Sequence, residues 1–121
     1  VSLVARALET AGIATVVIGS AMDIVTYCGI PRYVFTDFPL GNPCGRPWDE
    51  VSQRLIFERA LHALEGASEP GFIDVTPLRW SDSASWKSDY MRVGPDNIEA
   101  LRAAGEARRA QQAALRPQRD K

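Results

Sequence analysis

A run of β-branched and small apolar residues over 13–18 (IATVVI) most constrains what this chain can fold into. A continuous apolar run without polar alternation is typical of a strand buried on both faces, as in a parallel sheet covered by helices. Gly19 and Ser20 end the run, and a second strand is expected over residues 32–36 (RYVFT). The chain is therefore expected to contribute at least two strands to a buried sheet.

Helical patterns flank both expected strands. Apolar residues at helical spacing predict a helix over residues 3–11 and a longer helix over 48–65. Between the strands, Ser20 followed by Asp23 is typical of the start of a short helix that ends near Cys28. This alternation with short connections predicts an α/β fold with a parallel, flavodoxin- or Rossmann-like sheet. A parallel α/β unit normally begins with a strand, and none precedes the first expected helix. We therefore expect the sheet to be incomplete at its N-terminal end.

The composition changes after residue 66. We predict a parallel α/β core over 1–66, an extended arm containing Pro, Ser and Trp over 67–95, and an Ala- and Arg-rich helix with a disordered tail over 96–121. The arm and helix carry little regular apolar periodicity, which predicts loose docking. The aromatic side chains of the arm either form a lid over a site or hold the arm against the core or a partner: Trp80, Trp86 and Tyr90.

Charge and composition exclude several classes of protein. Fourteen Lys and Arg against fifteen Asp and Glu give a net charge of −1, which offers no electrostatic surface for nucleic acid or an anionic membrane. No apolar run approaches the roughly 20 residues of a membrane helix, and no signal peptide is visible, so a cytoplasmic location is expected. Two cysteines and one histidine predict neither a disulfide framework nor a metal site within the chain.

Two loops are candidates for binding a ligand. In open parallel sheets, ligands bind at the carboxyl ends of the strands, where the loop at Gly19 and the loop over residues 37–47 are expected. Both loops lead into helix N-termini, which favour carboxylate or phosphate groups. The polar side chains could hold a substrate ammonium or amide, or could satisfy turn backbone. The predicted substrate-binding residues are Gly19, Ser20, Asp37, Leu40, Gly41 and Asn42.

The two cysteines are expected to differ. Cys44 lies in the second loop shortly before a helix, a position that can activate a thiol as a nucleophile. The alternative is a loop cysteine without reactivity. Cys28 shares a helical face with Ile24 and Val25, which favours a core position. If the chain has redox competence, Cys44 is the candidate catalytic residue, and its sulfur is expected near the N-terminus of the first helix.

Four stretches resemble the selenoprotein B family of glycine, sarcosine, betaine and D-proline reductases. Residues 7–16 (ALETAGIATV) are similar to the family segment "IE-x-AGIPTV", and residues 23–32 resemble the helix and strand that follow it. Residues 38–43 (FPLGNP) match "HPLGNP", and residues 55–64 match the closing helix. The order and spacing are kept over roughly half of the chain. The PLGNP motif is moderately specific by itself, and the ordered set of segments is the stronger basis for the resemblance.

The resemblance implies an oxidoreductase that reductively cleaves a C–N bond of an amino acid or an N-methylated derivative. In the family, a selenocysteine or cysteine motif immediately precedes the first helix, so the main redox residue is expected upstream of residue 1. No cofactor is expected within the chain, beyond a selenocysteine or cysteine centre in a full-length protein. The partners implied are other reductase subunits or a second copy, with an amino-acid-like substrate.

This chain departs from the family pattern by lacking the redox motif, by a shorter loop before PLGNP, and by carrying Cys44. Two alternatives therefore stay open. One is a non-catalytic α/β binding or assembly module. The other is a binder of a small phosphate ligand at Gly19 and Ser20.

Overall fold

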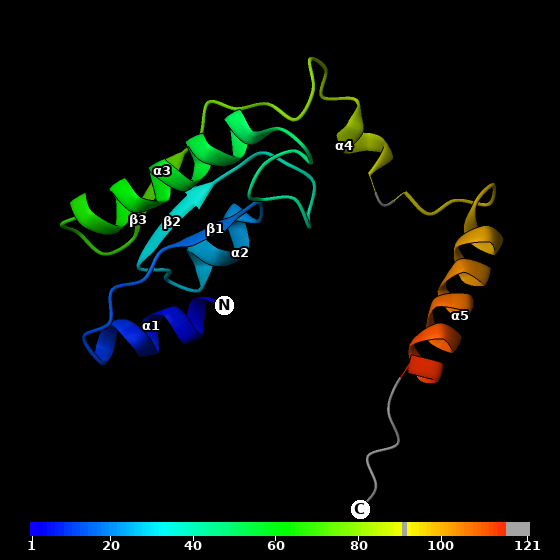
Figure 1. Ribbon diagram of the computed structural model, residues 1–121, viewed down its shortest axis with the longest axis horizontal. Helices are drawn as coiled ribbons and strands as arrows, with labels where there is room; N and C mark the ends of the chain where they lie inside the picture. Colours follow the sequence, from blue (N-terminus) through cyan, green and yellow to red (C-terminus); the bar gives the residue numbers. More distant parts are fainter. Residues whose placement is uncertain (91, 116–121) are drawn as a thin grey trace, which may run out of the picture. The chain divides into compact units, whose positions relative to one another are not determined.

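The computed structural model describes residues 1–90 and 92–115. The chain divides into two compact units, Val1–Lys87 and Ser88–Lys121. Figure 1 labels the elements of both. The expected disordered tail over 117–121 lies outside the described residues. Within the described part of the chain, no helix is long and apolar enough to cross a membrane.

The first unit is built on a parallel three-stranded sheet. The strands are β1 (Val17–Gly19), β2 (Arg32–Phe35) and β3 (Phe72–Val75), in the order β1-β2-β3. Both pairings are parallel, and Tyr33 at the centre of β2 pairs with Val17 on β1 and with Ile73 on β3. The predicted α/β class with a parallel sheet is therefore confirmed.

The first strand is shorter than its apolar run. Only Val17–Gly19 enters the ladder, whereas the sequence predicts a strand over 13–18. Thr15 directs its backbone N–H to the carboxylate of Glu9, at 2.5 Å, instead of to a neighbouring strand. The early part of the run is thus the connection between helix and strand, because a side chain from the preceding helix satisfies its backbone.

The described residues of the two units also form five helices: α1 (Ser2–Thr10), α2 (Met22–Tyr27), α3 (Glu50–Gly66), α4 (Trp86–Asp89) and α5 (Ile98–Leu115). Helix α3 starts two residues later than predicted, since Trp48 has a positive φ of 62° and Asp49 caps the helix by accepting from the Ser52 N–H. The predicted cap of α2 is wrong. Its N-cap is Ala21, without a side-chain hydrogen bond.

Helices cover both faces of the sheet. Alternate residues of β2 point to opposite faces. Tyr33 packs with Ala5 of α1 and with residues of α2, whereas Val34 packs with Ala60 and Ala63 of α3. Figure 1 shows α1 and α2 on one side of the strands and α3 on the other. The strands lie in the order β1-β2-β3, so the chain moves across the sheet in the same direction at both crossovers. Because α2 and α3 lie on opposite faces, the β1-α2-β2 and β2-α3-β3 crossovers have opposite handedness. One of them therefore departs from the usual right-handed connection.

The sheet extends beyond residue 66, where the sequence analysis ends the core. Strand β3 lies at 72–75 and pairs with β2 over four residues. Arg59 of α3 forms an ion pair with Asp74 of β3 and ties the helix to this strand. The expected arm over 67–95 thus begins with the third strand, and only its later part leaves the sheet.

The second unit contains the expected Ala- and Arg-rich helix. Helix α5 runs from Ile98 to Leu115. Its start is organised by Asn97, whose side-chain oxygen accepts from the Gly94 N–H at 2.8 Å. An ion pair between Arg92 and Asp96 lies beside this turn. Ile98 and Leu101 remain about half exposed, so the helix has little apolar burial of its own.

Candidate functional site

The two loops singled out by the sequence follow neighbouring parallel strands. Strand β1 ends at Gly19 and β2 ends at Phe35, and these two residues are register partners. One further ladder bond, from the Thr36 N–H to the Gly19 carbonyl at 3.0 Å, joins the chain just beyond the strands. The loops at Gly19 and at 37–47 therefore leave the same carboxyl edge of the sheet.

Thr36 links the two loops through its hydroxyl. Its side chain is fully buried, and its Oγ1 donates to the Pro43 carbonyl at 3.0 Å. The Ser20 Oγ lies 3.3 Å from the same Oγ1. Because a hydroxyl carries one proton, Ser20 is then the donor to Thr36. Sequence reasoning placed Thr36 in a strand and gave it no role, and its only signal was a hydroxyl at the end of an apolar strand.

Turns and one aromatic anchor shape the PLGNP loop. The Asn42 N–H donates to the Pro39 carbonyl, and the Gly45 N–H donates to the Asn42 carbonyl. Gly45 has a φ of 120°, and a Cβ there would lie 2.6 Å from the Cγ of Gln53 on α3. Phe38 is buried and stands edge-on to Trp80, with ring centroids 5.5 Å apart. The loop is therefore held at one end by the contact of Phe38 with Trp80 and at the other by the close approach of Gly45 to α3.

A surface groove of about 670 Å³ lies along this loop. It brings together three of the predicted site residues: Gly41, Asn42 and Cys44. Cys44 is an exposed residue and lines the groove. The remaining lining residues are Pro43, Gly45, Pro47, Gln53 and Phe57. This volume falls in the range of small-molecule sites, and its lining is mainly apolar with a few polar groups.

The other predicted residues lie outside this groove. Asp37 forms an ion pair with Lys87, at 2.6 Å, beside a small cavity of about 150 Å³. Trp80 and Trp86 line that cavity, so two of the aromatic residues of the arm lie next to Asp37. Leu40 is 58% exposed and is not among the groove residues. Gly19 and Ser20 both contact Thr36, which in turn donates to the Pro43 carbonyl of the loop.

The two cysteines differ in exposure, and the expected approach of Cys44 to the start of α1 stays a prediction. The groove around Cys44 is lined by the loop and α3, and no lining residue comes from α1. Cys28 is half-buried at the C-cap of α2, and its carbonyl accepts from the Arg6 Nη1 at 3.3 Å. Its expected core position is not observed, since Ile24 on the same helical face is 62% exposed.

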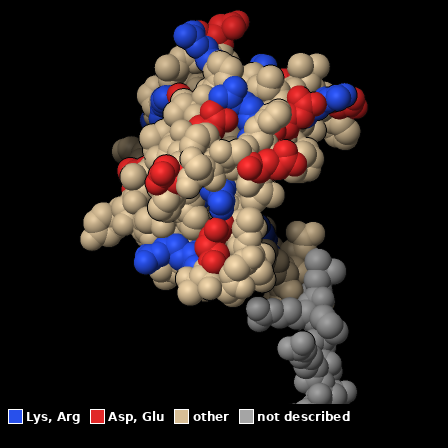
Figure 2. Space-filling view, turned by 90° about the vertical axis from the view of Figure 1, so that its left-hand side faces the viewer, with Lys and Arg blue, Asp and Glu red and all other residues tan. Residues whose placement is uncertain are grey.

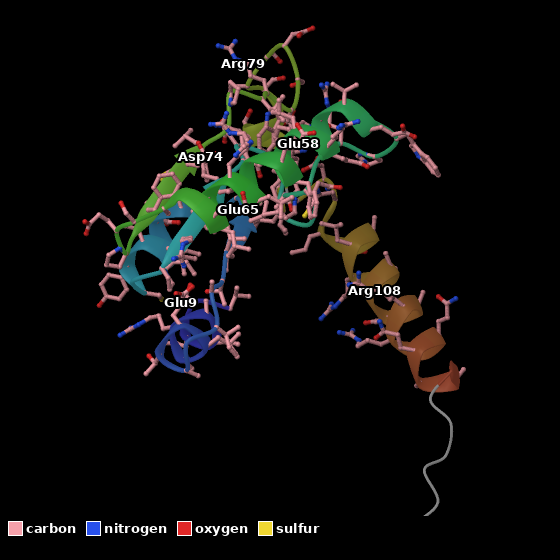
Figure 3. All side chains as sticks on the ribbon, turned by 60° about the vertical axis from the view of Figure 1, so that its left-hand side comes forward. Glu9, Glu58, Glu65, Asp74, Arg79 and Arg108 are labelled. Atoms are coloured by element: carbon pink, nitrogen blue, oxygen red, sulfur yellow. The ribbon has the colours of Figure 1, made fainter. Side chains whose placement is uncertain are left out.

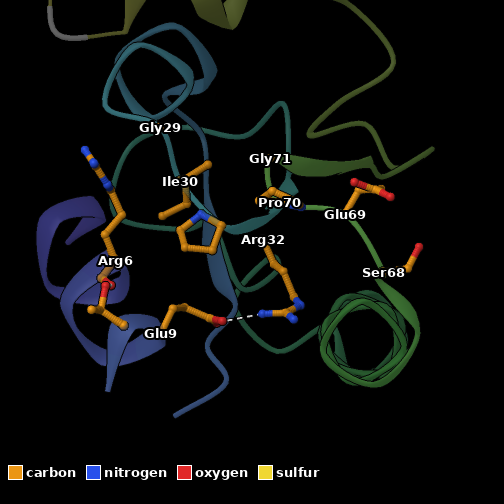
Figure 4. A pocket seen from close by; sticks show the side chains of 11 residues that line it. Arg6, Glu9, Gly29, Ile30, Arg32, Ser68, Glu69, Pro70 and Gly71 are labelled. Carbon is orange, nitrogen blue, oxygen red and sulfur yellow. Dashed lines mark hydrogen bonds and ion pairs between the residues drawn. The ribbon is translucent and has the colours of Figure 1, made fainter. Parts of the chain in front are cut away.

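A second cavity, of about 570 Å³, lies at the opposite, amino edge of the sheet. Figure 4 shows it between α1, the start of β2 and the loop before β3. Among its lining residues, the Glu9 carboxylate pairs with the Arg32 guanidinium at 2.6 Å. The Arg32 Nε is buried and makes no hydrogen bond to the described residues. The remaining polar residues that line the cavity are Arg6, Thr10, Ser68 and Glu69.

Glu9 holds Arg32 in place at this cavity. Its Oε1 accepts from the backbone N–H and the hydroxyl of Thr15 as well as from Arg32. These bonds, the Thr15 N–H first among them, lower the pKa of Glu9 below its usual value. Figure 3 shows Glu9 on the side of α1 that faces the strands. The carboxylate is therefore the ionised partner that fixes the guanidinium.

Sequence reasoning missed this cavity. Its lining comes from four separate segments: α1, the α2–β2 connection, the start of β2 and the α3–β3 connection. Each segment alone is typical of a helix surface or a turn. Figure 2 shows this end of the first unit, where acidic and basic side chains are interspersed instead of separated by sign. A ligand with charges of both signs suits such a lining better than a polyanion.

The described residues hold no group of three or more His, Cys, Asp or Glu side chains placed to bind a metal ion. Comparison with family models, with curated proteins and with solved structures finds no match for this chain.

Proposed function

We propose that this chain is part of a thiol- or selenol-dependent reductase resembling the glycine, sarcosine, betaine and D-proline reductases, with the PLGNP loop facing the substrate. The observation that carries the proposal is the hydroxyl bridge from Ser20 through Thr36 to the Pro43 carbonyl. This bridge supports one connected binding edge made from both predicted loops. The exposed Cys44 in the adjoining groove adds a thiol to that edge.

The chemistry requires an attacking group and a second thiol. A selenolate or thiolate forms a bond to the substrate α-carbon while the C–N bond breaks and the amine leaves with the electron pair. In the family this attacking residue precedes the segment that 7–16 resemble. Cys44 would serve as a resolving thiol: its thiolate would attack the sulfur or selenium of this adduct, and the bond to the α-carbon would break as that carbon leaves with the electron pair and takes up a proton. The resulting mixed disulfide or selenosulfide would then be reduced by an external dithiol, which supplies two electrons.

Ligand binding to the loop is tested by titrating the isotope-labelled chain with glycine, sarcosine, betaine and D-proline while recording amide NMR shifts. The proposal expects shifts at Ser20, Gly41 and Asn42, and their loss on Ser20→Ala or Thr36→Val substitution. Ser68→Ala, at the amino-edge cavity, is the matched control and should leave the shifts unchanged. Saturating ligand without any shift at the loop would contradict the proposal.

The role of Cys44 is tested separately by alkylation at neutral pH. Cys44 is exposed and Cys28 is half-buried, so iodoacetamide should modify Cys44 first. Cys44→Ser should remove the fast phase, and Cys28→Ser should leave it intact. A Cys44 that reacts no faster than an unstructured peptide of the same sequence would remove it from the redox proposal.

A second candidate function is non-catalytic binding of a small zwitterionic or anionic ligand at the amino edge. The observation favouring it is the 570 Å³ cavity lined by Arg6, Arg32 and Glu69. In the same NMR titration, shifts confined to Gly29 and Gly71 would support this binding module over the reductase. Arg6→Gln should then weaken binding, whereas Ser20→Ala should not.

The phosphate-binding alternative at Gly19 and Ser20 has less support. The Ser20 hydroxyl is engaged with Thr36, and Gly19 lies against the Tyr33 ring. Helix α2, which follows, has only six residues, so its dipole is small. Titration with inorganic phosphate and with flavin mononucleotide is the direct test, with the Ser20 amide as the reporter.

A further inference from the structure

Helix α1 turns its most apolar face away from the sheet. The buried residues of α1 are Ser2 and Ala5, whereas Leu3 is 70% exposed and Val4 is 63% exposed. On a helix, residues 2, 5 and 9 share one side, and residues 3, 4, 7 and 8 lie on the opposite side. The amphipathic pattern at the start of the chain therefore describes an outward stripe, not the contact with the core.

The end of α1 extends this stripe. Gly12 has a φ of 82° and donates to the Glu9 carbonyl, while the Ile13 N–H donates to the Leu8 carbonyl at 2.9 Å. These two bonds form a Schellman motif, which brings the residue after the glycine against the last turn of the helix. Ile13 is 54% exposed and so adds to the apolar surface next to Leu8.

Helix α2 adds exposed apolar side chains over the same face of the sheet. It covers the same face of the sheet as α1, and Arg6 on α1 donates to the Cys28 carbonyl at the end of α2. Ile24 is 62% exposed and Tyr27 is 94% exposed. We call this surface the outer apolar face, and its residues are Leu3, Val4, Leu8, Ile13, Ile24 and Tyr27.

The area of this face matches one side of a protein interface. The six residues are between 37% and 94% exposed, and together they present an area of the order of the roughly 800 Å² that each partner contributes to a standard interface. Monomeric proteins rarely expose contiguous apolar patches larger than a few hundred Å². Tyr27 supplies the kind of large, amphipathic side chain that anchors interfaces.

The charges around the face favour a second copy as its occupant. Of the charged residues on α1 and α2, Glu9 faces the sheet and is paired with Arg32, which leaves Arg6 and Asp23 as the exposed charged residues of the two helices. Because the two charges have opposite signs, two copies of this surface do not repel each other. A two-fold axis can set Arg6 of one copy opposite Asp23 of the other. A membrane surface would require a basic polar face, which a single arginine does not provide.

We infer that the outer apolar face is the interface of a symmetric dimer of this chain. The dimer buries Leu3, Val4 and Leu8 of each α1 against the α1 and α2 surface of the other copy. In an isologous contact the same surface of both copies is buried, so the assembly closes at two chains. The groove at the PLGNP loop has no lining residue from α1 and lies outside this contact. This inference does not depend on the proposed function.

The test is the mass of the full chain in solution, by light scattering and sedimentation equilibrium at about 100 μM, where a dimer with a Kd in the micromolar range is detected. The chain should have twice its 13.3 kDa mass. Raising the salt concentration to about 1 M should leave the dimer intact, because its contacts are apolar. Val4→Asp should weaken dimerisation at least about 100-fold, and Tyr27→Ser should weaken it in the same direction.

Val4→Asp is a suitable probe because it should not unfold the chain. Val4 is the third residue of α1, where a carboxylate is favourable to the helix dipole. Val51→Asp on α3 is the matched control, since Val51 is 80% exposed and lies on the other face of the sheet, and it should leave the dimer unchanged. Circular dichroism verifies that each variant is folded.

Three outcomes would overturn the inference. A wild-type chain that stays monomeric at 100 μM has no such dimer, whether the face is free or is covered by α5. A dimer that Val51→Asp dissociates as strongly as Val4→Asp uses another surface. A wild-type dimer that survives Val4→Asp and Tyr27→Ser together in folded protein also uses another surface.

Discussion

Gly19 on β1 lies against the ring of Tyr33 on β2, so closely that a Cβ at Gly19 would lie 2.6 Å from the Tyr33 hydroxyl oxygen and 3.0 Å from Cε2. Tyr33 is fully buried, and burial raises the pKa of its phenol. Its hydroxyl makes no hydrogen bond to the described residues. The absence of a side chain at Gly19 therefore leaves the space that the Tyr33 ring occupies in the core.

Gly19→Ala should destabilise the chain by about 1–3 kcal/mol, the usual effect of overpacking a buried contact. Urea unfolding measures the change. Gly66→Ala is the control, because a Cβ there meets nothing within 4 Å at the end of α3. Adding Tyr33→Phe to Gly19→Ala removes the nearest atom and should recover part of the loss. Strictly additive effects of the two substitutions would show that the contact is absent.

Thr36→Val should lower stability by about 1–2 kcal/mol, since it removes a buried hydroxyl and leaves the Pro43 carbonyl without its donor. Thr36→Ser keeps the hydroxyl and should recover most of that loss. Hydrogen exchange over residues 37–47 should rise in the Val variant, because the loop loses its link to the sheet. Thr26→Val, at an exposed position on α2, should change neither property. Unaltered exchange in Thr36→Val would contradict a linking role.

The ion pair between Arg59 and Asp74 should contribute more stability than the exposed pair on the same helix. Arg59 donates to both carboxylate oxygens of Asp74, and the two side chains are 34% and 19% exposed. Arg59→Ala should reduce the free energy of unfolding by about 1–2 kcal/mol, between the values for surface and buried pairs. Arg59→Lys should recover little, because an ammonium cannot make the two parallel bonds. Arg54→Ala, which breaks the exposed pair with Glu58, should have a smaller effect. Equal effects at the two arginines would contradict the structural role of the Asp74 contact.

The Glu9 carboxylate predicts a dependence of stability on pH. Its pKa is lowered in the folded chain from 4.5, mainly by the Thr15 N–H. Near pH 4.5 the unfolded state therefore binds more protons, and stability rises with pH through that window. The contribution of Glu9 is present above pH 4.5 and is lost as the pH falls through the lowered value.

Glu9→Gln should therefore be less stable than the wild type at pH 7, and the difference should shrink below pH 4.5. Urea unfolding at pH values from 3 to 7 measures it. Glu65→Gln, at an exposed position on α3, should follow the wild-type curve. A difference between Glu9→Gln and wild type that stays constant over this pH range would point to altered packing instead of the carboxylate.

The sequence by itself determined the class of the fold and the edge that carries the PLGNP loop. A continuous β-branched run, an aromatic and β-branched run, and helical periodicity between and around them are local patterns, and each reports its own element. Parallel pairing follows from their alternation, and with it the shared carboxyl edge of Gly19 and the loop over 37–47. The groove brings Gly41, Asn42 and Cys44 together because they are neighbours in the chain.

Only the tertiary structure decided what joins distant segments. Glu9 and Arg32 meet at the amino edge, and Thr36 joins Ser20 to Pro43, through contacts that no periodicity encodes. Strand β3 lies within the segment predicted as an extended arm over 67–95, because its place in the sheet depends on pairing with β2. The sequence pattern predicts the apolar stripe of α1, but it does not predict that this stripe faces away from the sheet. Periodicity gives the width of a stripe, whereas its partner is chosen by packing between elements, which depends on the three-dimensional arrangement of the whole unit.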